Sequence, residues 1–346
     1  MADQATAPVG DGFTLDTDTA EHYARAAGLE VVHGSGTALT GGVSSIVVAL
    51  DGRPPIVVKQ ALSRLAVEAS WDAAPERAST EASALRLTRQ VTPDHVPAVL
   101  LADPLNHVVV IARAPAAWQN WRDVLLEHPT LVDVDRAHEL GRVLGSWHST
   151  TWDDDAVRDA FSDDLAFDQL RIDPFYREIR RRHPDLAASI DPLIAEATGL
   201  RQCLVHGDYS PKNVLVGADG FWMLDHEVAR VGAAVFDLAF MTSHLMLKAI
   251  HRPDAAGMYA AAGAAFLDGY RRENPRPEAL AGLGEHVAAL LLARVDGKSP
   301  AGYLTDADRI RTRDLAVEAL GGLEALGPRP VAELWSSVVD AGKDRG

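Results

Sequence analysis

Cysteine and long apolar runs are the features that this chain of 346 residues most clearly lacks. Its single cysteine, Cys203, excludes an internal disulfide and a zinc site built from several cysteines. No stretch is long and apolar enough to resemble a signal segment or a membrane span. The sequence therefore predicts a cytoplasmic protein without a membrane partner.

Positive charge is scarce as well. The chain has 33 Lys and Arg residues against 49 Asp and Glu residues, which gives a formal net charge of −16. A duplex nucleic acid or an anionic membrane would be repelled by this charge. We therefore expect no nucleic-acid partner, and any phosphate that the protein binds must be held by a local cluster of residues.

The first 113 residues are rich in strand patterns. Asp51-Gly52 is typical of a hairpin turn between two apolar runs. Helical patterns appear at residues 16–28 and 75–91. The runs with strand character are residues 31–42, 44–50, 54–62, 96–103 and 107–114. This pattern predicts a small, mostly antiparallel sheet with one main helix.

Long helical patterns dominate the rest of the chain, with one short β segment among them. A strand at 203–206 is followed by a hairpin over 214–227 that turns at 218–220. The predicted helices are residues 134–152, 191–201, 258–274, 278–295 and 312–326. We therefore predict an α+β, bilobal protein with a small β-rich lobe over 1–113 and a large helical lobe over 114–346.

The β segment of the helical half carries a group of polar residues with a specific spacing. Asp208 precedes Asn213 by five positions, as the base precedes a metal ligand in the catalytic loop of kinases. Asp225 follows the hairpin, which we expect to bring it back beside Asn213 as a second oxygen ligand for one metal ion. Glu227 points to the same side of an extended segment. An Asp alone in a polar turn is more often a turn former, and the combined spacing is what favours phosphoryl transfer.

The β-rich half supplies candidates for holding phosphates. Gly41 and Gly42 lie between apolar runs and allow the backbone to approach a phosphate, and Ser44 adds a donor. Lys59 ends the strand IVVK, as the phosphate-pairing lysine of kinases ends V-A-I-K. Glu81, in the helix that follows, is the expected ion-pair partner of Lys59.

The blocks HGDYSPKN, LDHE and FDLA resemble those of the aminoglycoside phosphotransferase and choline kinase superfamily. Residues 57–85 and 224–250 resemble the corresponding stretches of 5-methylthioribose kinases most closely. The similarity spans roughly residues 36–300. It implies a protein-kinase-like fold, with a nucleotide-binding lobe over 1–113 and a catalytic loop and acceptor site in 114–346.

The resemblance also implies a role for each matching residue. Asp208 becomes the catalytic base, and Asn213, Asp225 and Glu227 become the metal ligands. Lys59 contacts the nucleotide phosphates with Glu81 as its partner. Two further residues support the catalytic loop, namely Asp237 of FDLA by hydrogen bonds and His206 as a member of the loop.

The chain departs from methylthioribose kinases late in the sequence. Those enzymes share an Arg-Arg pair near the substrate, whereas here Ala293 precedes Arg294 and a DGKSP segment follows. Arg294, Lys298 and His226 are the candidate acceptor contacts. Cations near the C-terminus of a helix are also stabilised by the helix dipole, which explains Arg294 and Lys298 without an acceptor, so both interpretations stay open.

The leading hypothesis is a small-molecule kinase that uses ATP and Mg²⁺ and phosphorylates a hydroxyl group. The resemblance favours methylthioribose or a related pentose as acceptor, with an aminoglycoside or another small alcohol as the alternative, and it implies a homodimer. Two other classes rank lower. A metal-dependent phosphohydrolase built on His206, Asp208, Asp225 and His226 leaves Lys59 without a role. A nucleotide-binding module without catalysis does not explain why all the catalytic candidates are present, namely Lys59, Asp208, Asn213 and Asp225.

Overall fold

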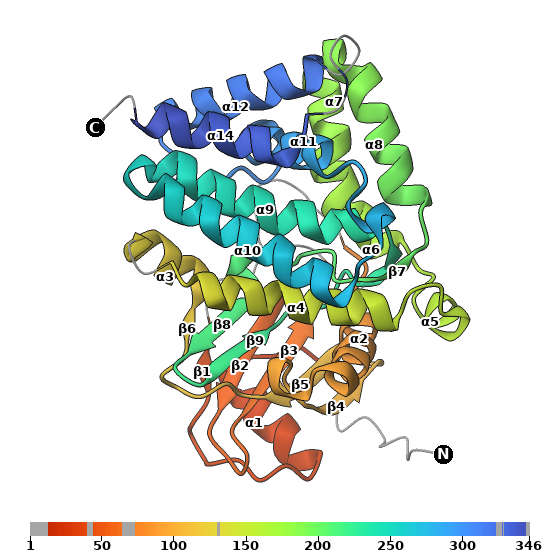
Figure 1. Ribbon diagram of the computed structural model, residues 1–346. Helices are drawn as coiled ribbons and strands as arrows, with labels where there is room; N and C mark the ends of the chain where they lie inside the picture. The colour runs from red at the N-terminus through yellow and green to blue at the C-terminus, as the bar shows by residue number, and fades with distance from the viewer. Residues whose placement is uncertain are drawn as a thin grey trace. The chain divides into compact units, whose positions relative to one another are not determined.

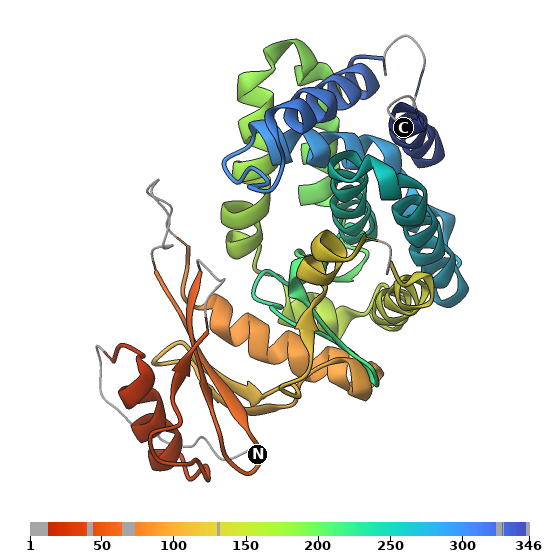
Figure 2. The same ribbon diagram turned by 90° about the vertical axis from the view of Figure 1, so that its left-hand side faces the viewer.

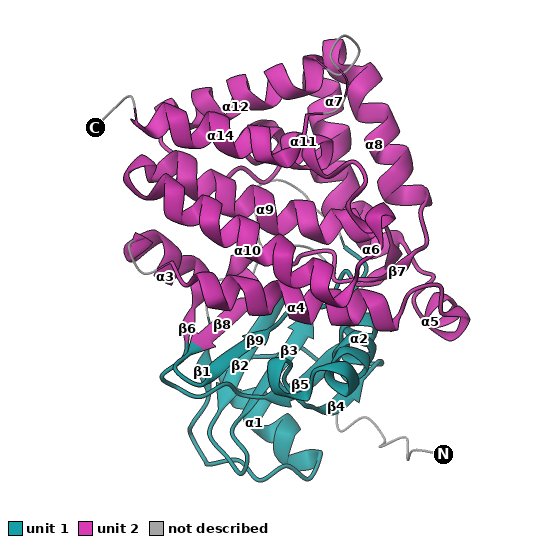
Figure 3. Cartoon of the chain, in the orientation of Figure 1, with its two compact units in different colours: residues 1–118, 217–228 teal, residues 119–216, 229–346 magenta. Residues whose placement is uncertain are grey.

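The computed structural model describes residues 13–343 except 40–43, 64–72, 130–131, 323–326 and 328. The chain forms two compact units (Figure 3). Unit 1 consists of residues 1–118 and 217–228, and unit 2 of residues 119–216 and 229–346. Each unit is described by itself. The predicted division into lobes 1–113 and 114–346 stays a prediction.

Unit 1 is built on a five-stranded antiparallel sheet with the strand order β1-β2-β3-β5-β4 (Figure 1). Lys59 lies in the central strand, opposite Val47 on one side and Val109 on the other. The strands are β1 (Thr37–Ala38), β2 (Ser45–Leu50), β3 (Ile56–Ala61), β4 (Val99–Asp103) and β5 (Val108–Ala112). A further strand, β9 (Gly220–Met223), and the short helix η1 (Pro93–His95) complete the unit.

Two helices pack against opposite faces of this sheet because side chains alternate along each strand (Figure 2). Helix α1 (Thr17–Ala26) places Tyr23 in a cluster with Val48 and Val58. Helix α2 (Arg77–Val91) packs Ala78 and Ala82 against the other face. Lys59 alternates with Val58 along β3, so it belongs to the face that α2 covers. The sheet thereby presents Lys59 to the helix that carries Glu81.

Unit 2 is mainly helical, with two small strand pairs. β7 (Cys203–Val205) pairs with β10 (Arg230–Gly232), and β6 (Gln119–Asn120) pairs with β8 (Val214–Gly217). The longer helices are α3 (Trp121–Glu127), α4 (Val134–Thr150), α8 (Ala187–Gly199), α9 (Ala234–His251), α10 (Ala256–Glu273), α11 (Leu283–Asp296), α12 (Asp306–Gly321) and α14 (Val331–Lys343). The shorter helical elements are α5 (Asp155–Ala160), α6 (Leu165–Phe167), η3 (Asp168–Arg177), α7 (Glu178–Arg182), η4 (Pro184–Leu186), η5 (Pro211–Asn213), η6 (Pro253–Ala255) and η7 (Pro277–Leu280).

Helix α9 is the core of unit 2. Every residue from Ala234 to Ile250 is buried, and the helix packs against α10 and α11 (Figure 1). A helix that is covered on all sides needs no polar face, so its charged residues require a specific explanation. Asp237 and Lys248 are the two charged residues of the buried stretch other than histidine.

The predicted α+β fold is confirmed, and several boundaries differ. The strand expected over 31–42 is limited to Thr37–Ala38 and a single bridge at Val31, and residues 40–42 lie outside the described part. The helix expected over 278–295 begins at Leu283, because Gly282 has a left-handed φ of 71°. No described helix has both the length and the apolar character that crossing a membrane demands.

Candidate active site

The loop that carries Asp208 is anchored in unit 2 by a buried carboxylate. Asp237 on α9 accepts hydrogen bonds from the amides of His206 at 2.6 Å and Gly207 at 2.8 Å. The ring of His148 lies 3.2 Å from the same carboxylate. Gly207 has a φ of 75°, which a residue with a side chain rarely adopts. The loop after β7 is therefore fixed by two backbone contacts and by a conformation that favours glycine.

The carboxylate of Asp208 lies between two cations. Arg171 Nη2 and Lys212 Nζ each lie 2.8 Å from Asp208 Oδ2. Arg171 also donates to the Gly207 carbonyl at 2.6 Å, so it holds both the backbone and the carboxylate of the loop. Neighbouring cations favour the ionised carboxylate, which is the form that accepts a proton. Asn213 donates to the Asp208 carbonyl at 2.9 Å and is nearly buried.

Arg171 is placed by an unusual helix. It belongs to η3, a ten-residue π-helical stretch that contains Pro174. π-Helical turns are rare and occur frequently at functional sites. The wider turn brings Arg171 to the loop, and Phe175 of the same element contacts α9 through the ring of Phe240.

In unit 1, Lys59 is surrounded by carboxylates. Its ammonium group forms ion pairs with Glu81 at 2.9 Å and with Asp225, and Glu227 lies at 4.0 Å. Burial lowers the pKa of Lys59, but the three carboxylates raise it by more, so the net pKa lies above its usual range. Burial raises the pKa of Glu81, and Lys59 opposes this only in part. Lys59 is therefore a fixed positive charge.

Asp225 has a backbone conformation that few residues adopt. Its φ is 66°, in the left-handed region that Asp tolerates better than most residues. Such a conformation costs on the order of 1–3 kcal/mol and occurs mainly at functional sites. The turn after β9 thus directs the Asp225 carboxylate toward Lys59 at an energetic cost.

Arg77 connects Glu227 to the rest of unit 1. Its Nε donates to Glu227 Oε2 at 3.1 Å. The other guanidinium nitrogens donate to the backbone carbonyls of Ser44, Leu62, Ala73 and Ala74. Arg77 is 2% exposed, so it is a buried hub that orients Glu227.

Two further residues predicted for the site, Ser44 and His226, lie in unit 1. Gly41 and Gly42 lie outside the described residues. Ser44 contributes its carbonyl to Arg77. His226 is buried in unit 1, where its Nε2 lies 3.3 Å from the Thr88 hydroxyl.

The two cations at the end of α11 have different surroundings. Lys298 forms an exposed ion pair with Asp173 of η3. Arg294 is half-buried in unit 2, donates to the carbonyl of Ser299 and lies over the ring of Phe175. The roles of Arg294, Lys298 and His226 as acceptor contacts stay predictions.

Sequence reasoning missed three charged residues of these clusters. Lys212 had a local signal, because it lies within SPKN and four residues after Asp208. Arg171 and Arg77 gave none, since their partners Asp208 and Glu227 lie 37 and 150 residues away in the chain.

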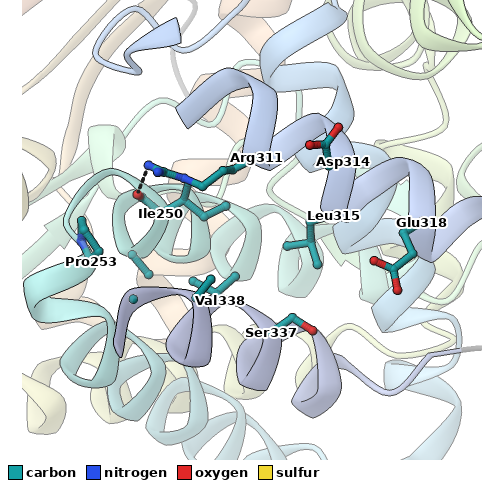
Figure 4. A pocket seen from close by; sticks show the side chains of 11 residues that line it. Ile250, Pro253, Arg311, Asp314, Leu315, Glu318, Ser337 and Val338 are labelled. Atoms are coloured by element: carbon teal, nitrogen blue, oxygen red, sulfur yellow. Dashed lines mark hydrogen bonds between the residues drawn. The ribbon is translucent and has the colours of Figure 1, made fainter. Parts of the chain in front are cut away.

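A cavity in unit 2 lies among α9, α12 and α14 (Figure 4). It has a volume of about 220 Å³ and is lined by Ile250, Leu315 and Val338 among others. Arg311 at its edge donates to the carbonyl of Ile250 at 3.2 Å. None of the site residues predicted from the sequence lines it. Within the described ranges, no three His, Cys, Asp or Glu side chains form a metal-binding group.

Comparison with known proteins identifies the family to which this chain belongs. Residues 36–276, more than half of the chain, match the phosphotransferase enzyme family, and the chain belongs to this family. A methylthioribose kinase of Bacillus cereus (strain G9842) is 26% identical over 236 residues, which are 59% of this chain and 58% of the relative. The matched stretch is thus less than two thirds of that relative's length. The homologous enzyme of strain B4264 is 24% identical over 238 residues, with the same coverage of both chains.

Solved structures support the same fold. The amicoumacin kinase hAmiN, in complex with AMP-PNP, Ca²⁺ and Ami, is 16% identical and has a TM-score of 0.58, with 94% of each chain covered. The macrolide 2′-phosphotransferase MphH of Brachybacterium faecium has a TM-score of 0.52 at 18% identity, covering 93% of this chain and 98% of its own. The kinase-like fold expected from the sequence is therefore confirmed.

Proposed function

We propose that this protein transfers the γ-phosphoryl group of ATP to a hydroxyl group of a small, sugar-like acceptor. The observation that carries the proposal is the Asp208 carboxylate, which forms ion pairs with Arg171 and Lys212 on a loop fixed by Asp237. An ionised carboxylate in a fixed position can accept a hydrogen bond from the attacking hydroxyl and take its proton. Family membership supports the same reaction class.

Asp208 orients the acceptor in this proposal. The hydroxyl donates to the Asp208 carboxylate, and the proton passes to Asp208 as the bond from the acceptor oxygen to phosphorus forms and the bond from phosphorus to the ADP oxygen breaks. Asp237 acts indirectly by holding the His206 and Gly207 amides, which prevents the loop from turning the carboxylate away. Asn213 supports the loop by donating to the Asp208 carbonyl.

The residues of unit 1 fit the nucleotide phosphates and a divalent cation. Three carboxylates, Glu81, Asp225 and Glu227, lie around Lys59 and Arg77, and carboxylate oxygens are the hard donors that Mg²⁺ prefers. Asp225 has the most exposed side chain of the three, at 25%. We propose Asp225 as the principal Mg²⁺ ligand, with Asn213 and Glu227 as the further ligands. When bound, Mg²⁺ neutralises charge on the phosphates, and Lys59 adds a fixed positive charge.

A pentose of the methylthioribose type is the first acceptor to test, because relatives with that name match the chain. The surroundings of Asp208 speak against the aminoglycoside alternative. Arg171 and Lys212 supply two positive charges at the carboxylate, and a polycationic acceptor would be repelled by them.

The test is a coupled assay of ADP release with Mg·ATP against a panel of pentoses including methylthioribose, choline, homoserine and aminoglycosides, with water as the reference acceptor. Asp208→Asn should lower turnover by about 10²–10⁴-fold with nearly unchanged ATP affinity. Asp219→Asn, in the exposed turn after β8, is the matched control and should leave both values unchanged. Unchanged turnover in Asp208→Asn would refute the role of the carboxylate.

A further inference from the structure

Helix α9 buries a lysine for which the described residues provide no anionic partner. Lys248 is 0% exposed, and its ammonium group donates to the carbonyl of His244 at 3.3 Å, one turn earlier in the same helix. The ring of Tyr303 lies 5.5 Å from the same nitrogen. In the described part of the chain, no Asp or Glu forms an ion pair with Lys248. A buried ammonium group without a counter-charge is strongly unfavourable in a protein interior.

A second cation, Arg294 of α11, forms no ion pair with a carboxylate of the described residues. It donates through Nη1 to the carbonyl and the hydroxyl of Ser299, and its buried Nε has no hydrogen-bond partner in the part of the chain that the structure describes. Its charge acts on Lys248: burial lowers the pKa of Lys248 first, and Arg294 and Arg122 lower it further, to about 7. Asp123 opposes this effect but is already paired with Arg122 at 2.8 Å.

The loop after α11 holds these groups in place. Gly297 lets the loop pass close to η3, since a Cβ there would lie 2.9 Å from the Pro174 carbonyl and 2.3 Å from that of Ala293. Ala301 donates to the Arg294 carbonyl at 2.8 Å, which closes the loop around the arginine. The same loop leads to Tyr303, whose buried hydroxyl forms no hydrogen bond with any described residue. Three elements therefore bring donor groups together, and among the described residues no carboxylate forms an ion pair with Lys248 or Arg294.

This group is connected to Asp208 by direct contacts. Arg294 lies over Phe175, and Phe175 packs edge-on against Phe240. Arg171 lies over the ring of Phe240 and forms an ion pair with Asp208. His244, next to Phe240, is a neutral neighbour, because burial and the surrounding cations hold its pKa well below the usual range. Arg294 also interacts electrostatically with Asp208, which opposes the lowering of the arginine's pKa by burial, so the group lies within reach of the proposed catalytic carboxylate and in the same unit.

We infer that the acceptor carries an oxyanion, a carboxylate or a phosphate, that binds to Lys248, Arg294 and Tyr303 while its hydroxyl group faces Asp208. The inference rests on the proposed function for the identity of the bound molecule, whereas the anion site itself rests on the side chains alone. An oxyanion supplies both the acceptors and the negative charge that the three donors lack. The acceptor class is therefore a hydroxy acid or a sugar phosphate.

The same donors could instead serve the phosphoryl group in transfer, and the experiment must separate the two sources. Saturating AMP-PNP fills the nucleotide site before the probes are added. The probes are ribose 5-phosphate, ribonate and the neutral ribose, and the readout is the melting temperature together with titration calorimetry. Lys248→Met removes the charge with little change in volume, and Lys343→Met on the exposed end of α14 is the matched control.

With AMP-PNP bound, the two anionic probes should bind at least about tenfold more tightly than ribose to the wild type and to Lys343→Met, as charge-assisted hydrogen bonds predict. Lys248→Met should abolish this preference, and its own melting temperature shows that it is folded. Binding above pH 7 should be accompanied by proton uptake, because the anion favours the charged form of Lys248. Equal binding of anionic and neutral probes, or a preference that persists in Lys248→Met, would overturn the inference.

Catalysis is measured separately. In the ADP assay, Lys248→Met should lower kcat/KM for an anionic acceptor by about tenfold or more beyond any change that it causes with a neutral acceptor or with water. An equal loss with anionic, neutral and water acceptors would assign the cations to the transferred phosphoryl group and refute the acceptor site. Anion binding that depends on Lys248 without any phosphoryl transfer would leave the anion site standing and refute the proposed function.

Discussion

Two buried lysines of this protein have opposite surroundings. Lys59 in unit 1 lies among three carboxylates, which hold its pKa above the usual range although the side chain is largely buried. Lys248 in unit 2 has no carboxylate partner among the described residues, and burial with nearby cations lowers its pKa to about 7. The protein completes the first site with its own charges, whereas the second has donors and no counter-charge. The difference distinguishes Lys59, a positive charge fixed by neighbouring carboxylates, from Lys248, a group suited to a bound anion.

The largest effect on stability should come from removing the Lys59 charge. Lys59→Met leaves Glu81 and Asp225 buried or half-buried without their cation, so the free energy of unfolding should fall by about 3–5 kcal/mol. Urea unfolding followed by circular dichroism measures this loss. The double variant Lys59→Met/Glu81→Gln should recover part of it, because one of the stranded charges is then neutral. A full loss in the double variant would show that packing, and not charge, dominates at this site.

Lys248→Met should change the free energy of unfolding in the direction opposite to Lys59→Met. Replacing an unpaired buried ammonium group by an apolar side chain of similar size should raise the free energy of unfolding at pH 6 by about 1–4 kcal/mol. The same urea experiment at pH 6 gives the value, and Lys343→Met should stay within about 0.5 kcal/mol of the wild type. A destabilised Lys248→Met protein would mean that the lysine has a partner and would remove the contrast with Lys59.

The pH dependence of stability gives a smaller and more specific test. The pKa of Lys248 is about 7 in the folded protein and about 10.4 in the unfolded chain, so between these values the unfolded chain binds more protons. The unfavourable contribution of the charged lysine is therefore complete below pH 7 and disappears as the pH rises toward 10. The difference in unfolding free energy between Lys248→Met and wild type should shrink from pH 6 to pH 9. A constant difference over this range would contradict the lowered pKa.

The smallest effect should come from a lysine that is paired in solvent. Lys298 forms an exposed ion pair with Asp173, with side chains 41% and 40% exposed. Lys298→Met should change the free energy of unfolding by no more than about 1 kcal/mol, and the change should shrink in 0.5 M NaCl. A larger loss, unaffected by salt, would show that the loop over η3 depends on this pair.

Much of the fold was predictable from the sequence because local patterns carried it. The hairpin at Asp51-Gly52 and the helix that carries Glu81 follow from turn chemistry and from strand and helix patterns. Helix α9 was not predicted, because a helix buried on all sides shows no polar face and its apolar run resembles a strand or a core segment equally.

The candidate site divides in the same way. Asp208, Asn213, Asp225 and Lys59 were found from spacing along the chain. Arg77, Arg171 and Lys248 were not, because their importance depends on which distant residues fold against them. Their roles follow from burial and from the presence or absence of a partner charge, and both arise only in the folded protein.

Helix α9 also sets the distance between the loop that carries Asp208 and the anion group formed by Lys248, Arg294 and Tyr303. Asp237 and Lys248 are separated by 11 residues, or about 16 Å at 1.5 Å per residue, and this separation returns the side chain to nearly the same face. Deleting one residue between them would rotate Lys248 by about 100° relative to Asp237 and carry it away from Tyr303. A change of acceptor in this protein must therefore arise by substitutions that keep the length of α9 constant. An insertion or deletion between Asp237 and Lys248 would separate the catalytic loop from the anion group.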